Sequence, residues 1–181
     1  MTEDLKSLAL DAIAASVATD DPDYPCFHVV PPVGRLNDPN GLLVDGDTYH
    51  AFYQFSPFHP HRKLVYWGHS SSTDLLHWRH HAPAINPNSS YDRSGAYSGN
   101  AIVLEGAELN GAAAQVPYYL FYTGNLKDPV TDERTASQCL VTTGDLTDFT
   151  KWPGNPLIPT HAEGYTAHYR DPQVFRDPDR P

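Results

Sequence analysis

The stretch Asn37-Asp38-Pro39-Asn40-Gly41-Leu42-Leu43-Val44 decides how this chain of 181 residues is interpreted. Its first half consists of turn-forming residues and its second half of strand-forming apolar residues, so the pattern places a carboxylate on a turn at the mouth of a sheet. A matching stretch, Arg170-Asp171-Pro172 followed by Gln173-Val174-Phe175, stands far along the chain. Two Asp-Pro turns that each lead into an apolar strand indicate corresponding positions in a repeated architecture. Paired carboxylates presented in this way are typical of glycosidic-bond chemistry.

The segment between these two stretches contains two units of similar pattern, each with four short strand-like runs. The runs of the first unit cover residues 41–44, 48–55, 65–72 and 74–78, and those of the second cover 100–104, 117–124, 137–143 and 145–152. The period is roughly 70 residues, longer than a minimal propeller blade because loops are inserted. Repeated four-stranded units predict blades of an all-β propeller. A third unit begins at Arg170 and contains one strand, and two and a half blades close no ring, so we expect a fragment.

The first 23 residues are expected to lie outside this propeller. A short amphipathic helix is predicted from apolar residues that recur near helical spacing, namely Leu5, Leu8, Leu10, Ile13 and Val17. The acidic run 20–23 contains a proline and ends the helix as a linker. We therefore divide the chain into a helix and linker, residues 1–23, and an incomplete propeller domain, residues 24–181.

The charge balance argues against two classes of partner. The chain has 12 basic and 22 acidic side chains and a formal net charge of -10, whereas nucleic acids and anionic membranes attract basic surfaces. No stretch is apolar enough to span a bilayer, and the acidic N-terminus lacks the basic start and apolar run of a signal peptide. We therefore expect no nucleic-acid partner, no membrane partner and a cytoplasmic location. Nothing in the pattern predicts an oligomeric state.

Cysteine and histidine residues do not predict a metal site. Cys26 and Cys139 stand far apart and are interpreted as two buried free thiols. The histidines are interpreted as residues of loops and blade faces. The adjacent His80 and His81 point to opposite faces of a strand, so they do not easily share an ion. We expect neither a bound metal nor a cofactor.

Six motifs occur in a fixed order over residues 34–175. They are Arg35-Leu36-Asn37-Asp38-Pro39-Asn40-Gly41, Phe52-Tyr53-Gln54, Tyr66-Trp67-Gly68-His69, Asp74-Leu75-Leu76-His77-Trp78, Tyr97-Ser98-Gly99-Asn100 and Tyr169-Arg170-Asp171-Pro172. Together they resemble glycoside hydrolase family 32, which contains invertases, sucrose-6-phosphate hydrolases and fructanases. The resemblance implies a five-bladed β-propeller followed by a β-sandwich. This chain would hold roughly the first two blades and the first strand of the third, with a short N-terminal helix.

The sequence departs from the family pattern in two places. Arg35 and Leu36 stand where the family usually has Trp-Met, which changes the packing beside the first carboxylate. The Glu-Cys motif that supplies the family's acid/base does not occur in the sequence. The resemblance therefore implies that the acid/base lies beyond Pro181 and that this chain is inactive alone.

The resemblance also assigns roles to individual residues. Asp38 would be the nucleophile that attacks the anomeric carbon of a fructosyl unit. Asp171 would grip fructose hydroxyls while Arg170 holds it ionised. Trp67 would stack on the apolar face of a furanose ring and Ser98 would donate to a hydroxyl. The remaining expected substrate contacts are Asn37, Gln54 and Tyr97.

These observations predict a retaining glycoside hydrolase that releases fructose from sucrose, sucrose 6-phosphate or short β-fructans through an intermediate on Asp38. The expected partner is sucrose or a fructo-oligosaccharide. Two alternatives remain open. An inverting, arabinanase-like glycosidase would need more widely separated carboxylates. A non-catalytic sugar-binding propeller would retain Gln54 and Trp67 and would have no need for Asp38.

Overall fold

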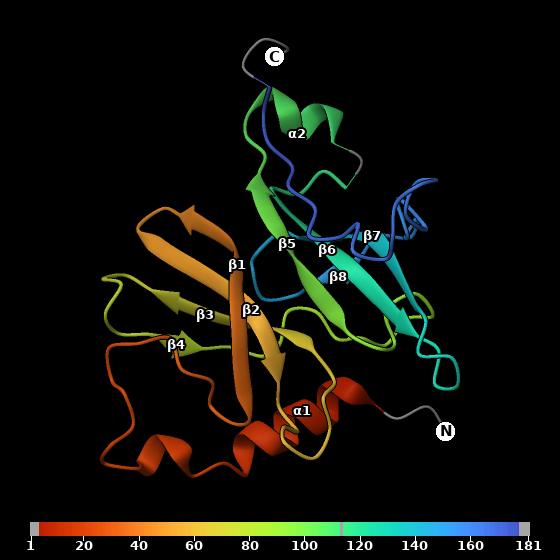
Figure 1. The fold of residues 1–181 in the computed structure, drawn as a ribbon. Helices are drawn as coiled ribbons and strands as arrows, with labels where there is room; N and C mark the ends of the chain where they lie inside the picture. Colours follow the sequence, from red (N-terminus) through yellow and green to blue (C-terminus); the bar gives the residue numbers. More distant parts are fainter. Residues whose placement is uncertain (1–3, 113, 178–181) are drawn as a thin grey trace.

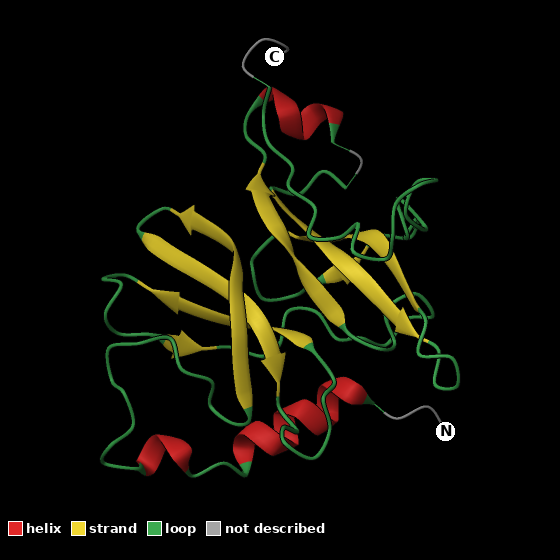
Figure 2. Ribbon diagram, in the orientation of Figure 1, coloured by secondary structure: helices red, strands yellow, loops and turns green. Residues whose placement is uncertain are grey.

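The computed structural model describes residues 4–112 and 114–177 and contains two four-stranded antiparallel sheets (Figures 1 and 2). The first sheet, called blade 1, has the strand order β1 (Arg35–Asp45), β2 (Thr48–Ser56), β3 (Tyr66–Ser72) and β4 (Arg79–His80). The second, blade 2, has the order β5 (Ala96–Val103), β6 (Tyr118–Lys127), β7 (Arg134–Thr143) and β8 (Thr150–Lys151). The helical elements are α1 (Leu5–Ala14), α2 (Ala107–Gly111) and the 3-10 turn η1 (Ala18–Asp20). The predicted all-β class and the two repeated units are confirmed.

The first and last strands of each blade differ from those predicted. β1 begins at Arg35 instead of Gly41, so Asp38 lies within a strand and not on a turn before it. The predicted fourth strand of blade 1 is largely a turn, because the carboxylate of Asp74 accepts the backbone N–H groups two and three residues later, at 2.9 and 2.7 Å. Asp145 makes the same turn in blade 2, with both distances at 2.9 Å. Each turn is followed by an outer strand of two residues.

Helix α1 packs against blade 1. Asp4 caps the helix, because its side-chain Oδ1 accepts hydrogen bonds from the backbone N–H groups of Lys6 and Ser7 at 3.1 and 3.2 Å. Leu5 and Ala9 are buried in a cluster with aromatic residues of β2 and β3, and the hydroxyl of Tyr66 donates to the carbonyl oxygen of Leu5 at 3.1 Å. The helix ends at Ala14, three residues before the predicted end, and the partly buried Ile13 of its last turn packs against the same cluster.

A shared apolar core joins the two blades. Phe52 and Trp67 of blade 1 and Leu120, Tyr122 and Val141 of blade 2 belong to one buried cluster. The inner strands β1 and β5 are neighbours in space, as Figure 1 shows. Because burial of apolar surface is the main favourable contribution to folding, this cluster fixes the relative position of the inner strands.

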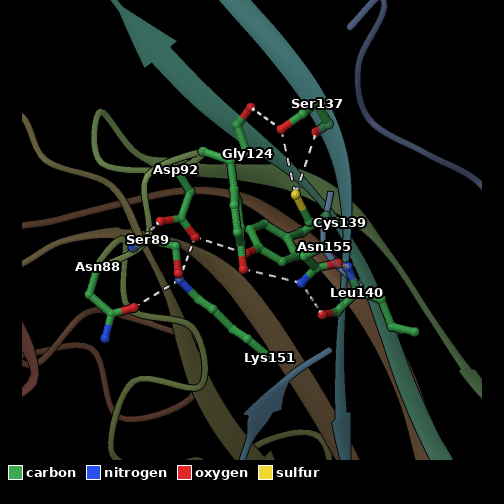
Figure 3. A network of polar contacts seen from close by, with 11 residues as sticks. Asn88, Ser89, Asp92, Gly124, Ser137, Cys139, Leu140, Lys151 and Asn155 are labelled. Atoms are coloured by element: carbon green, nitrogen blue, oxygen red, sulfur yellow. Dashed lines mark hydrogen bonds and ion pairs between the residues drawn. The ribbon is translucent and has the colours of Figure 1, made fainter. Parts of the chain in front are cut away.

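Blade 2 also buries a charged network under its core (Figure 3). Asp92 is 0% exposed, and its Oδ2 lies 2.5 Å from the Nζ of Lys151 and accepts the hydroxyl of Tyr122 at 2.8 Å. Burial lowers the pKa of Lys151, and the attraction of Asp92 opposes that shift. Burial and the carboxylate of Asp92 raise the pKa of Tyr122, so its hydroxyl stays protonated and donates. The pair is surrounded by partners that satisfy a buried charge.

The start of the third unit lies alongside β5. The side-chain amide of Asn100 donates to the carbonyl oxygen of Val174 at 2.8 Å and accepts the N–H of Val174 at 3.0 Å. Residues 171–177 have no regular secondary structure, and among the described residues no strand pairs with them. The predicted third-blade strand is therefore held by a side chain and does not belong to a sheet in this structure.

The cysteines differ from each other in exposure. Cys139 is buried as expected, whereas Cys26 is exposed, which corrects the prediction of two buried thiols. Cys26 lies in the irregular segment before β1, where no sheet covers it. Within the described residues, no helix has the length and apolar character that a bilayer crossing requires.

Candidate active site

The inner strands of both blades carry a bulge at the same place. In β1, Asn37 pairs with Gln54 of β2 and Pro39 pairs with Tyr53. Asp38 is therefore an extra residue between two consecutive pairs of the sheet. In β5 the two neighbours of Ser98 pair with consecutive residues of β6 in the same way. A bulge of this kind redirects the side chain of the extra residue. Asp38 and Ser98 are therefore equivalent positions of two repeats.

Local sequence explains why the strands deform there. Asp38 has a φ of 30°, which aspartate tolerates better than most residues because its short side chain bonds to nearby backbone. In blade 2, Gly99 follows the bulge and approaches β6 so closely that a Cβ atom would lie 2.0 Å from the carbonyl oxygen of Phe121. Only glycine fits at that position without moving the strand.

A chain of hydrogen bonds joins the two bulges. The amide of Gln54 donates to the hydroxyl oxygen of Ser98 at 2.6 Å, and that hydroxyl donates to Oδ2 of Asp38 at 3.4 Å. The amide of Asn37 donates to Oδ1 of Asp38 at 3.0 Å, and Arg35 donates to the amide oxygen of Asn37 at 2.9 Å. Both carboxylate oxygens of Asp38 are thus oriented by donors from β1 and β5. Asp38 itself remains exposed.

Asp171 reaches the same region from the third unit. Its φ of 60° resembles that of Asp38, and its N–H donates to the hydroxyl oxygen of Thr123 at 2.8 Å. Burial raises the pKa of the Asp171 carboxyl, Arg170 opposes this shift, and the negative charge of Asp38 adds to it. The Asp171 carboxyl therefore lies within electrostatic range of Asp38.

Arg170 is therefore only one of the groups that determine the pKa of Asp171. Nε of Arg170 lies 3.7 Å from Oδ2 of Asp171, and both side chains are roughly two-fifths to one-half exposed, at 39% and 47%. At that distance and exposure the attraction is weaker than the effect of burial, so the net shift of the Asp171 pKa is upward. The assignment of Arg170 to holding Asp171 ionised stays a prediction.

Tyr97 lies near two guanidinium groups. The centre of the Arg134 guanidinium is 6.0 Å from the ring centroid, and that of Arg170 is also 6.0 Å away. Nη1 of Arg134 additionally donates to the Tyr97 hydroxyl at 2.9 Å. Tyr97 is half-buried, so its ring forms part of the wall of the site.

Trp67 has a different position from the one expected. Its side chain is 0% exposed and packs against Phe52 and Tyr122, with ring centroids 6.0 and 6.4 Å away. Its indole N–H donates to the carbonyl oxygen of Tyr97 at 2.9 Å. The prediction that Trp67 stacks on a sugar ring is wrong for this structure, because both faces of the indole are covered. Trp67 instead positions the backbone beside Ser98.

A cavity of about 370 Å³ opens beside this group of residues. Asn37, Gln54 and Tyr97 line it where it meets the site. The residues that line the remainder include four basic ones, namely Arg35, Lys63, Lys127 and Arg134. The cavity falls within the range of volumes that enclose small ligands, roughly 300–1,000 Å³.

The structure brings together seven of the eight residues singled out from the sequence, and Trp67 lies in the core behind them. Sequence reasoning did not assign Lys63, Lys127 or Arg134 to the site. Lys127 and Arg134 meet because they are paired residues of β6 and β7, a register that no local motif indicates. Arg35 was noticeable only as a departure from the family motif. In the described part of the chain, no three His, Cys, Asp or Glu side chains are grouped so as to hold a metal ion.

Comparison with known proteins gives one consistent family. Residues 28–180 match the family model of the glycosyl hydrolases family 32 N-terminal domain. A sucrose-6-phosphate hydrolase of Klebsiella pneumoniae is 45% identical over 163 residues, which cover 90% of this chain and 32% of that protein. This chain thus spans about a third of the length of the curated relatives that it matches.

Solved structures agree with this match. A family 32 β-fructofuranosidase of Bombyx mori superposes with a TM-score of 0.77 and 31% identity, over 96% of this chain and 34% of that one. A sucrose-6-phosphate hydrolase of Lactobacillus gasseri superposes with a TM-score of 0.74 and 35% identity, over 95% of this chain and 32% of that one. The two open sheets therefore correspond to part of a five-bladed β-propeller.

Proposed function

This chain belongs to glycosyl hydrolase family 32, and from that premise we propose that it forms part of a retaining β-fructofuranosidase. The proposed reaction is hydrolysis of the fructosyl bond of sucrose-type substrates. The observation that carries the proposal is the position of Asp38 at a bulge, with both carboxylate oxygens held by donors from two blades. A residue with only a turn-forming role would need no such partners from the neighbouring blade.

In the proposed mechanism, Asp38 is the nucleophile. One of its oxygens bonds to the anomeric carbon of the fructosyl unit as the bond to the leaving sugar oxygen breaks, and an acid protonates that oxygen. Water then attacks the same carbon, loses a proton to the same group acting as base, and releases fructose with Asp38 regenerated. Two displacements at one carbon retain its configuration.

Asp171, Arg170 and the amides are proposed to hold the fructosyl unit. The position of Asp171 near Asp38 supports contacts with sugar hydroxyls, which strengthen as positive charge develops on the ring. We assign Asp171 to binding and not to proton transfer, which is the role that membership of the family implies for it. Asn37, Gln54, Tyr97 and Ser98 surround the same space, which supports a role in substrate binding.

The acid/base is proposed to come from outside residues 1–181. A retaining pair of carboxyl groups stands roughly 5 Å apart. Among the described residues, Asp171 is the carboxyl group whose pKa the charge of Asp38 shifts, and we assign it to binding. We therefore expect the 181-residue chain to release no fructose by itself, because the leaving alkoxide would not be protonated.

The test uses the natural protein that carries this chain at its full length, with sucrose as substrate. Fructose release is followed enzymatically, and the anomer first formed is identified by NMR before mutarotation. The proposal predicts release with retained configuration. Inverted product would favour the arabinanase-like alternative. Sugar binding without any release would favour a non-catalytic binding propeller.

A further inference from the structure

The cavity beside the candidate active site has a charge opposite to that of the chain. Four of the twelve Lys and Arg residues of the chain line it, and no Asp or Glu does, although the formal net charge is -10. They come from separate elements: Arg35 from β1, Lys63 from the segment before β3, Lys127 from the end of β6 and Arg134 from the start of β7. A random distribution of so few cations over an acidic surface would not gather them in one cavity.

Most of these charges are not neutralised by the protein. Lys127 forms an ion pair with the exposed Asp132. Within residues 4–112 and 114–177, no carboxylate lies at ion-pair distance from Arg35, Lys63 or Arg134. Arg35 and Arg134 each donate one bond to a neutral group, Asn37 Oδ1 and Tyr97 OH, at 2.9 Å in both cases. A guanidinium has five N–H donors, so most of its capacity remains for a ligand.

The cavity is continuous with the site. Asn37, Gln54 and Tyr97 line it and also contact the residues around Asp38. A ligand that places a sugar at Asp38 and carries an anionic group therefore has access to these cations from the same site. Phosphate monoesters carry a charge of about -1.5 to -2 near neutral pH and offer three acceptor oxygens, which arginine forks and lysine ammonium groups recognise.

We propose that this cavity is the subsite for the phosphoryl group of a phosphorylated β-fructoside, and that Arg35, Lys63, Lys127 and Arg134 select that substrate over the unphosphorylated sugar. The inference rests on the proposed function for its sugar and on the cavity for its anion. Arg134 has a second effect, because its bond to Tyr97 connects the anion subsite to the wall of the fructosyl site. Lys63 contacts neither Asn37 nor Tyr97 in the interactions found, so it reports on the anion alone.

The first test compares kcat/KM for sucrose 6-phosphate and for sucrose in the full-length protein. Lys63→Gln and Arg134→Gln are compared with the wild type and with Arg79→Gln, which removes a cation from β4 outside the cavity. We expect the ratio of the two kcat/KM values to fall by roughly 10- to 100-fold in the cavity variants, the worth of one charge-assisted hydrogen bond. The ratio should be unchanged in Arg79→Gln. Sucrose 6′-phosphate, assayed in parallel, tells whether the phosphoryl group is on the glucosyl or the fructosyl unit.

The second test separates this inference from the proposed function. Binding of glucose 6-phosphate and of inorganic phosphate to the same four proteins is measured by calorimetry, which needs no fructose release. We expect the Kd values to rise at least tenfold in Lys63→Gln and Arg134→Gln and not to rise in Arg79→Gln. This result would support the subsite even if no hydrolysis is found. Two results would overturn the subsite and leave the hydrolase proposal standing. The first is fructose release with the same ratio of kcat/KM for sucrose 6-phosphate to that for sucrose in all four proteins. The second is phosphate binding that is equal in all four proteins or absent from all four.

Discussion

In blade 1 the extra residue of the inner strand is Asp38, whereas in blade 2 the same position is occupied by Ser98. The neighbours on both sides pair with the adjacent strand in the same way, so the backbone of the two repeats is equivalent there. Ser98 donates to Asp38 and thereby orients it. The repeat thus provides the position twice, and the side chain decides which copy performs the chemistry and which one supports it.

The interiors of the blades differ as well. Blade 1 contains stacked histidines, with the ring of His69 4.5 Å from those of Phe52 and His81 and 5.2 Å from that of His50. Blade 2 has no histidine and instead buries the Asp92–Lys151 pair. Burial lowers the pKa values of the blade 1 histidines, so that interior resists protonation, whereas the interior of blade 2 depends on a pair of opposite charges. The two blades should therefore respond to different perturbations.

The largest difference is expected between substitutions at the two bulges. In the full-length protein, Asp38→Asn should lower kcat for fructose release by on the order of 10⁴-fold or more, because it removes the proposed nucleophile. Ser98→Ala should lower it by only about 10-fold, the loss of one orienting hydrogen bond. Circular dichroism controls for folding. Equal losses at the two positions would contradict the division of roles.

The next largest effect concerns the interior of blade 2. Lys151→Met should destabilise the protein by about 3–5 kcal/mol, because it leaves the buried carboxylate of Asp92 without a counter-charge. Lys6→Met on the exposed face of α1 is the matched control and should change stability by less than about 0.5 kcal/mol. Urea unfolding measures both. Recovery in the double variant Lys151→Met with Asp92→Asn would identify the unpaired charge as the cause.

A third comparison uses the turn that precedes the last strand of each blade. Leu146 is 4% exposed and belongs to the shared core, whereas its equivalent Leu75 is 51% exposed. Both have a positive φ, 56° and 64°, so backbone strain is similar. Leu146→Ala should lower the free energy of unfolding by about 2–5 kcal/mol, because packing in the core is lost. Leu75→Ala should change it by no more than about 0.5 kcal/mol. Similar losses in urea unfolding would show that the blades are buried alike.

The smallest effect is a pH dependence specific to blade 1. Burial, together with the neighbouring His81 and His50, lowers the pKa of His69 to about 2. The unfolded chain binds a proton below about pH 6.5 and the folded chain does not, so stability is complete above pH 6.5 and declines as the pH falls. The decline is at most about 1.4 kcal/mol per pH unit for each proton.

Variants of His69 provide the test of this pH dependence. His69→Leu should reduce the slope of stability against pH between pH 7 and 5, measured by urea unfolding at several pH values. The contributions of His50, His80 and His81, whose pKa values are also lowered chiefly by burial, should remain. An unchanged slope in His69→Leu would contradict the assignment of this titration to blade 1.

Sequence patterns predicted the architecture well because it repeats. The four-strand units and the two Asp-Pro motifs are local signals, and they located both blades and Asp38. The equivalence of Asp38 and Ser98 could not be predicted, because a bulge depends on the register between strands. Burial of Trp67 was missed since an aromatic residue beside a site fits both the core and a sugar. The basic cavity was missed because its cations come from four separate segments of an acidic chain.

A direct experiment identifies the residue that carries the fructosyl group during turnover. The full-length protein is mixed with sucrose, quenched in acid during turnover and digested, and the peptides are analysed by mass spectrometry. If Asp38 is the nucleophile, a fructosyl adduct is expected on the peptide that contains Asp38, and fragmentation should locate it on that carboxylate. An adduct on another carboxylate, or turnover without any adduct and with inverted product, would contradict it.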